Sequence, residues 1–276
     1  MIEREVALEA LCTLCNANVT SIQTQAVFPR AARVGGAPQQ QLLIKNFITT
    51  ILDADETCQV SRSNFVHLQS VLQGVDQAAG FARGNHVDIR TVTGRNHIID
   101  ENEFFDPRFD YDFTKLKDIE TYYRGGEVYE RPCGWQRFAL KILDKYDGNT
   151  WLGTSYRSTQ SVPGEWPVSY HGTSKMGADG IIDGYYKPGS GQVYGRGIYS
   201  TPYISEAIQY AKTFTSNKTG KKYRVILQNR INPTYRQKHN NDKYWLVPIP
   251  KGTSATEEQK MVERAIRPYG LLLKEV

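Results

Sequence analysis

The chain has 276 residues, of which 39% are hydrophobic and 23% charged, and its formal net charge at pH 7 is +5. This length accommodates one large domain or two smaller ones, and the composition is that of a soluble globular protein. No apolar run approaches the length of a membrane span, and the first residues lack the basic and apolar regions of a secretory signal. Four scattered cysteines suit a reducing compartment, so we expect an intracellular protein, cytoplasmic or nuclear, that does not bind a membrane.

Residues 3–16 repeat apolar side chains with the period of an amphipathic helix. Cys12 and Cys15 form a CxxC pair within this helix, on one face with Leu8 and Leu11. Either the two cysteines are small buried hydrophobic residues, or they belong to a metal or redox site. Because no second Cys pair and no nearby His completes a zinc set, the first interpretation is favoured and no metal ion is expected.

The remainder of residues 1–100 is predicted to be mainly helical. Residues 18–40 contain two Pro and a Gly-Gly pair and are expected to form a loop. Helices are predicted at 41–52 and 64–79, and a strand at 87–93. The inward-facing side chains of the first of these helices are expected to be Leu42, Leu43, Phe47, Ile48 and Ile51. Eight basic and nine acidic residues leave 1–100 almost neutral, and we interpret it as an accessory segment without a catalytic role.

Residues 101–131 are acidic, with nine acidic and five basic side chains among several aromatic ones. The stretch could bind a metal or a basic partner, although it lacks the spacing of an EF-hand. The alternative, which the sequence favours, is a solvated connector held to the protein by its aromatic rings. These rings are Phe104, Phe105, Phe109, Tyr111 and Phe113.

From about residue 101 onward, short strands interrupted by Gly and Pro dominate the pattern. The strand candidates occupy residues 135–143, 151–156, 166–170, 222–229, 244–249 and 269–276. Residues 211–251 also carry ten basic side chains and a single acidic one. That stretch could bind phosphates or nucleic acid, or it could be an exposed face that balances the acidic connector.

Two glycine-containing motifs lie between residues 170 and 211. The first is Tyr170-His171-Gly172-Thr173, and the second is Gly195-Arg196-Gly197-Ile198-Tyr199. A helix is expected to start near Ser205 and to include Tyr210. A His beside bare backbone, together with two Tyr, suits a flat, amide-bearing, sugar-linked ligand better than a metal or a carboxylate. Taken singly, each element also fits an ordinary core His, a turn or a packed Tyr.

These motifs occur in order with Ile181-Ile182-Asp183-Gly184-Tyr185 and Ser205-Glu206-Ala207-Ile208-Gln209-Tyr210. In this order they resemble the catalytic domain of the poly(ADP-ribose) polymerase branch of ADP-ribosyltransferases, and the resemblance covers about residues 166–276. It implies an α+β fold in which a split, bent mixed β-sheet spans 101–276, with the helical N-terminal segment beside it. NAD+ would then be the co-substrate, bound between the two halves of the sheet.

The resemblance also implies roles for individual residues. His171 and Gly172 would bind the ribose and the amide, and Tyr199 and Tyr210 would enclose the nicotinamide ring. Thr173 and Gly197 complete the two motifs and count as cofactor-binding positions with them. Little acid–base catalysis is needed, because nicotinamide is a good leaving group and the transition state resembles an oxocarbenium ion.

Two positions depart from the family pattern. Ala207 stands where the family usually has a Ser that hydrogen-bonds the carboxamide. Lys243 stands at the position of the catalytic Glu, and it cannot accept a hydrogen bond from ribose. Asp242 precedes it and could substitute only after a one-residue shift of register, which would turn its side chain to the other face. Glu206 is another carboxylate nearby in sequence, but the resemblance gives it no role.

Family members that lack the Glu typically transfer a single ADP-ribose unit or are inactive, so elongation is not expected here. Three functions remain open. The chain could be a mono-ADP-ribosyltransferase acting on a protein or a nucleic-acid end, or an inactive module that binds NAD+ or ADP-ribose. It could also be a relative of RNA 2′-phosphotransferases, which carry a His-Gly-Thr motif but lack the Gly-x-Gly-Ile-Tyr element.

Overall fold

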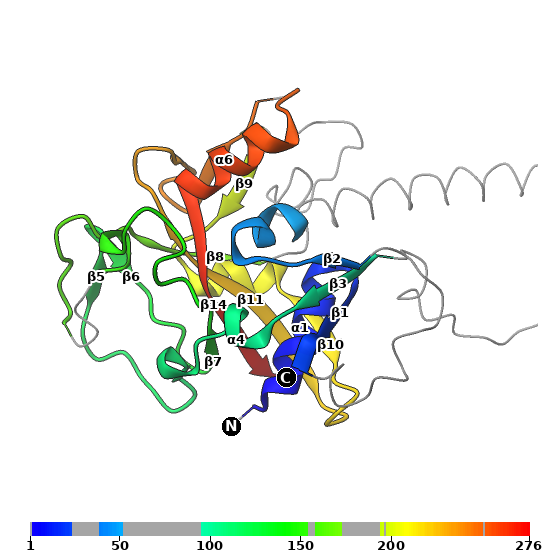
Figure 1. Ribbon diagram of the computed structural model, residues 1–276. Helices are drawn as coiled ribbons and strands as arrows, with labels where there is room; N and C mark the ends of the chain where they lie inside the picture. Colours follow the sequence, from blue (N-terminus) through cyan, green and yellow to red (C-terminus); the bar gives the residue numbers. More distant parts are fainter. Residues whose placement is uncertain are drawn as a thin grey trace, which may run out of the picture.

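The computed structural model describes residues 2–23, 39–51, 95–153, 158–172, 194–195, 197–250 and 252–276 (Figure 1). The predictions of a helix at 64–79 and a strand at 87–93, and most of the segment between the two glycine motifs, lie outside these residues. The described part is a mixed α+β structure with several sheets and few helices. The expected α+β class is therefore confirmed.

The largest sheet is built around β11 (Lys222–Ile231), whose side chains are buried from Val225 onward. Its order is β10 (Lys212–Thr215), β11, β14 (Ile266–Glu275), β7 (Gln136–Ala139) and β4 (Tyr111–Asp112). On one edge of β11, β10 pairs with its first half and β8 (Val168–His171) with its second half. Because β14 covers the other edge, β11 is paired along both sides.

The second sheet contains β12 (Gln237–His239), β13 (Tyr244–Pro248) and β9 (Gly197–Ser200) in that order. It meets the first sheet where Tyr170 of β8 and Thr201 exchange two backbone hydrogen bonds of 2.7 and 3.0 Å. This arrangement places the ends of β8 and β9 side by side. The two glycine motifs of the sequence therefore come from different sheets and meet at their junction.

The N-terminal segment packs onto the large sheet. Helix α1 (Arg4–Cys15) confirms the prediction for residues 3–16 and contacts β10. Its buried Leu11 belongs to the same hydrophobic core as Leu227 of β11 and Leu271 of β14. Figure 1 shows α1 beside β10, with the two chain ends close together. Cys15 is fully buried and Cys12 is half-buried, with its Sγ 3.3 Å from the backbone N of Val19.

The prediction of a loop over residues 18–40 is wrong at both ends of that stretch, where the structure has strands. β1 (Asn18–Ser21) and β2 (Gln39–Gln41) lie on either side of β3 (Asn96–Ile99) and run parallel to it. A short 3-10 helix, η1 (Ile44–Asn46), then continues into a helical turn at 47–51. This turn buries Phe47, whereas Leu43, expected to face inward, is 50% exposed because it precedes the first helical residue.

The connector contains α4 (Glu101–Phe104), η3 (Pro107–Phe109) and the hairpin of β5 (Tyr122–Arg124) and β6 (Glu127–Tyr129). Phe104, Phe105 and Phe113 are buried, as expected of anchoring rings, while Tyr111 is exposed.

In the chain beyond the connector, the structure differs from the sequence-based predictions at two further places. The strand predicted at 151–156 begins instead with η4 (Thr150–Leu152), whose Trp151 is buried. The helix α6 (Ala255–Ala265) was not predicted. Ser254 caps it by accepting a hydrogen bond from Glu257 N at 3.3 Å.

A buried ion-pair network lies beneath β8 and β11. One Glu165 oxygen is 3.0 Å from Arg230 Nη1 and 3.4 Å from Arg124 Nε, and all three side chains are less than a tenth exposed. Arg230 also donates to the backbone oxygens of Trp166 and Leu152 at 2.6 Å each. The two guanidinium groups therefore depend on one carboxylate for their counter-charge.

Candidate functional site

The candidate site lies where the two sheets meet. His171 ends β8, and its Nδ1 is 2.6 Å from the backbone oxygen of Tyr199 in β9. At this distance Nδ1 carries the proton, because a carbonyl oxygen can only accept. The contact fixes the imidazole of His171 across the junction of the two sheets.

Gly172 allows the end of β8 to approach the helix that follows β9. A Cβ at this position would lie 2.5 Å from the backbone oxygen of Ala207 and 2.9 Å from Cβ of Tyr210. Ala207 ends α5 (Ile204–Ala207), and Tyr210 ends the adjoining η5 (Ile208–Tyr210). The structure thus brings together His171, Gly172, Ala207 and Tyr210, four of the residues expected to surround the ligand.

Gly197 has a comparable role in the second sheet. It pairs with Pro248, and a Cβ here would lie 2.1 Å from the backbone oxygen of Val247. The close approach of β9 to β13 therefore requires glycine at this position. Thr173, the remaining expected cofactor-binding residue, lies outside the described residues.

Tyr199 is almost completely buried, with 1% of its surface exposed. Its hydroxyl donates to Gly195 O at 2.7 Å and accepts from Tyr194 N at 3.2 Å, and burial raises the pKa of this hydroxyl. Its ring packs in an apolar cluster with Tyr244 and Leu246. Stacking of a ligand on Tyr199 would require the backbone around Gly195 to move. The ring of Tyr210 is only partly buried and is the more accessible of the two for stacking.

A polar cluster extends from Tyr210 to the start of β13. A hydrogen bond links the hydroxyls of Tyr210 and Tyr244, and the Tyr244 hydroxyl in turn lies 3.5 Å from Glu206 Oε2. The other Glu206 oxygen is 3.1 Å from Nζ of Lys243. Burial, followed by the hydrogen bond with Tyr244, raises the pKa of Tyr210 to about 12. The direction of this effect indicates that the Tyr210 hydroxyl donates to that of Tyr244.

Asp242 lies in the turn before β13, apart from this polar cluster. Residues 240–242 all have positive φ, and Asp242 Oδ2 is 3.0 Å from Nζ of Lys238. Its side chain is 52% exposed. Of Asp242 and Lys243, only Lys243 has a side chain that contacts this polar cluster, through Glu206.

Glu130 positions α5. Its carboxylate accepts from the backbone N of Ile204 at 3.0 Å, and its backbone oxygen accepts from the hydroxyl of Tyr170. Burial raises the pKa of Glu130. The end of the β5–β6 hairpin thereby fixes both β8 and the helix that carries Glu206.

A scan against protein-family models, a search of curated proteins and a search of solved structures each found no match to this chain.

The basic stretch 211–251 is not uniformly exposed. Arg230 lies in the buried network, and Arg236 is 6% exposed, pairs with Glu127 and lies over the ring of Trp245 at 3.9 Å. Lys218, Lys221 and Lys222 are exposed near the turn between β10 and β11. Several of the ten charges therefore serve the fold, and binding of nucleic acid stays a prediction.

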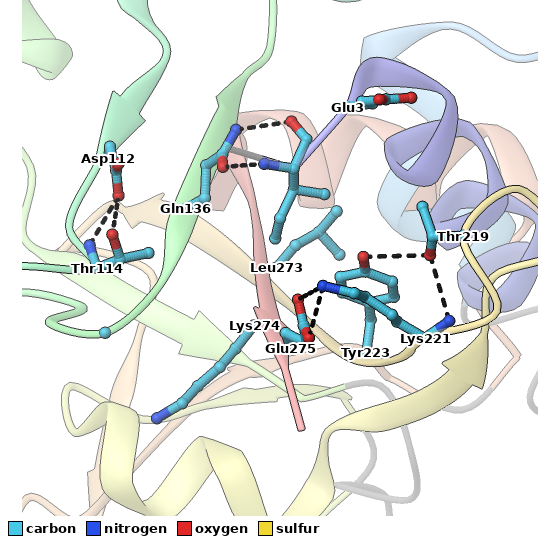
Figure 2. A pocket seen from close by; sticks show the side chains of 12 residues that line it. Glu3, Asp112, Thr114, Gln136, Thr219, Lys221, Tyr223, Leu273, Lys274 and Glu275 are labelled. Carbon is cyan, nitrogen blue, oxygen red and sulfur yellow. Dashed lines mark hydrogen bonds and ion pairs between the residues drawn. The ribbon is translucent and has the colours of Figure 1, made fainter.

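A cavity of about 440 Å³ lies near the start of β11 and the end of β14 (Figure 2). Gln136 bonds there to the backbone of Ile2 through its side-chain amide, and Lys221 pairs with Glu275 at 3.0 Å. None of the candidate residues lines this cavity. Among the residues that the structure describes, no cluster of His, Cys, Asp and Glu could hold a metal ion, and no helix is long and apolar enough to cross a membrane.

Sequence reasoning missed the interactions of Glu206 and Tyr244. Both residues were visible in the sequence, but α5 and β13 are nearly 40 residues apart, and only the antiparallel pairing of β9 with β13 brings them together. Lys243, just before the buried strand β13, is 39% exposed, so its place in the sequence did not by itself require an acidic partner.

Proposed function

We propose that this protein is an NAD+-dependent mono-ADP-ribosyltransferase that releases nicotinamide and transfers ADP-ribose to a protein or nucleic-acid acceptor. The observation that carries the proposal is the convergence of His171, Gly172 and Tyr210 at the junction of the two sheets. His171 and Gly172, at the end of β8, are far in the chain from Tyr210 in η5. They have the chemistry that a ribosyl–nicotinamide group requires, namely a hydrogen-bonding imidazole, bare backbone and an aromatic ring.

Each residue has a distinct task in this proposal. The His171 ring, held across the junction through Nδ1, can hydrogen-bond a ribose hydroxyl. Gly172 offers backbone N–H and C=O to the carboxamide without a side chain in the way. Tyr210 supplies the aromatic surface for the nicotinamide ring, and such a stack contributes about 1 kcal/mol beyond the area that it buries.

The test is release of nicotinamide from NAD+ by the purified protein, compared among wild type, His171→Ala and Tyr210→Ala. Loss of one hydrogen bond or one stacked ring should lower turnover at limiting NAD+ about 3- to 10-fold. Tyr235→Ala, which removes an exposed ring away from the site, should leave the rate unchanged. Equal rates in all four proteins would contradict the assignment of the site.

A second function is favoured by a specific observation. Lys243 stands at the start of β13 where a carboxylate would be expected, as in a module that binds NAD+ without cleaving it. Calorimetric binding of NAD+ without release of nicotinamide would support this module and exclude the transferase.

A further inference from the structure

We propose that Glu206, which contacts Lys243 and Tyr244, supplies the carboxylate that completes the site. This inference rests on the proposed function and identifies a catalytic residue for it. It starts from the observation that Glu206, in α5, forms an ion pair with Lys243, the residue just before β13.

Glu206 lies close to the residues assigned to the ligand. It is adjacent in sequence to Ala207, whose backbone oxygen would lie 2.5 Å from a Cβ at Gly172. Hydrogen bonds also lead from Tyr210 through the hydroxyl of Tyr244 to Glu206. The carboxylate is thus linked through Tyr244 to Tyr210, a residue assigned to the ligand.

The carboxylate of Glu206 also has the capacity to accept further hydrogen bonds. A carboxylate can accept about four hydrogen bonds. Among the residues that the structure describes, Glu206 has one contact of 3.1 Å, to Lys243, and one long contact of 3.5 Å, to Tyr244. Its side chain is 18% exposed, which leaves the group accessible from the solvent side. It therefore retains acceptor positions for a ribose hydroxyl.

The charges of Lys243 and Glu206 also favour this role. Lys243 alone would repel a sugar on which positive charge develops. Paired with Glu206 its charge is offset, and the negative group can face the sugar. The ion pair also holds the flexible Glu side chain in one orientation, which lowers the cost of ordering it in the transition state.

The chemical step then balances. The bond between ribose C1 and the nicotinamide nitrogen breaks with both electrons passing to nicotinamide, which leaves as a neutral molecule. A water or acceptor oxygen forms the new bond to C1. Its proton passes to the carboxylate of Glu206 and from there to solvent, while the same carboxylate stabilises the oxocarbenium-like sugar.

The experiment measures nicotinamide release and calorimetric NAD+ binding for wild type, Glu206→Gln, Glu206→Asp and Asp242→Asn. Glu206→Gln is nearly isosteric, and we expect it to lower kcat at least 100-fold while the Kd for NAD+ changes less than threefold. Glu206→Asp keeps the charge and should recover part of the lost kcat. Glu257→Gln, an exposed acid in the first turn of α6, is the control for loss of a surface charge.

The outcomes separate the two proposals. If the wild-type protein releases nicotinamide and Glu206→Gln releases it equally fast, the role of Glu206 is wrong and the proposed function stands. Loss of activity in Asp242→Asn alone would assign the carboxylate to the turn instead. If the wild-type protein releases no nicotinamide, the transferase and the role of Glu206 both fall. Thermal unfolding of each variant shows whether a lost rate reflects a lost fold.

Discussion

Glu165→Gln should lower the free energy of unfolding by about 3–5 kcal/mol, because it leaves two buried guanidinium groups without a counter-charge. Arg230 and Arg124 both depend on this carboxylate, and their side chains are 8% and 9% exposed. The backbone N–H of Val162 also donates to it at 3.2 Å. Since Gln has nearly the same volume as Glu, the change isolates the charge from the packing. Denaturant unfolding at neutral pH is the measurement.

Glu103→Gln is the matched control for this experiment. Glu103 also pairs with two cations, Lys141 and Lys145, at 2.6 and 2.7 Å, but on the surface of the protein. The unfolding midpoint of the Glu103→Gln variant at neutral pH should stay close to that of wild type. Equal midpoints for the Glu165 and Glu103 variants would contradict the dependence of the fold on the buried network.

Phe47→Ala should lower the free energy of unfolding by about 3–5 kcal/mol, the usual cost of deleting a buried aromatic ring. Phe47 is fully buried and packs edge-on against Phe104, with ring centroids 5.4 Å apart. The hydrophobic core that contains Phe47 also includes Leu227 and Leu271 of the large sheet. The loss should therefore destabilise the sheet as well as the N-terminal segment, in a single transition.

Two probes test this single transition. All four tryptophans lie at or beyond residue 135, so their fluorescence reports the sheets, while far-ultraviolet circular dichroism also detects α1. The two transitions should coincide in wild type and in Phe47→Ala. Leu43→Ala, at a half-exposed neighbouring position, is the control and should change little. Two separate transitions would instead support independent units on either side of residue 100.

The strands that sequence patterns predicted are those with continuous apolar runs. Residues 222–229 and 244–249 correspond to β11 and β13, which are buried along most of their length. β2 was missed because its sequence is Gln-Gln-Gln, which carries no apolar pattern and pairs through its backbone. For α6 the cap signal of Ser254 was present, but few apolar residues accompany it.

The candidate site was predictable only in part. Short motifs identified His171, Gly172 and Tyr210, because glycine-flanked positions stand out along the chain. The carboxylate of Glu206 could not be assigned, since its partner Lys243 is 37 positions away and only the pairing of β9 with β13 determines their distance. The burial of Tyr199 beneath Tyr194 and Gly195 depends on side-chain packing that local patterns do not contain.

The double-sided pairing of β11 determines where ligand binding can be detected by hydrogen exchange. Amides of β11 are enclosed by β14 on one edge and by β10 and β8 on the other, so they should exchange only when the whole protein unfolds. β12 is a three-residue edge strand and should exchange fastest in its sheet. A ligand at the junction should therefore slow exchange in β9 and β13, while β11 serves as the internal reference for global stability.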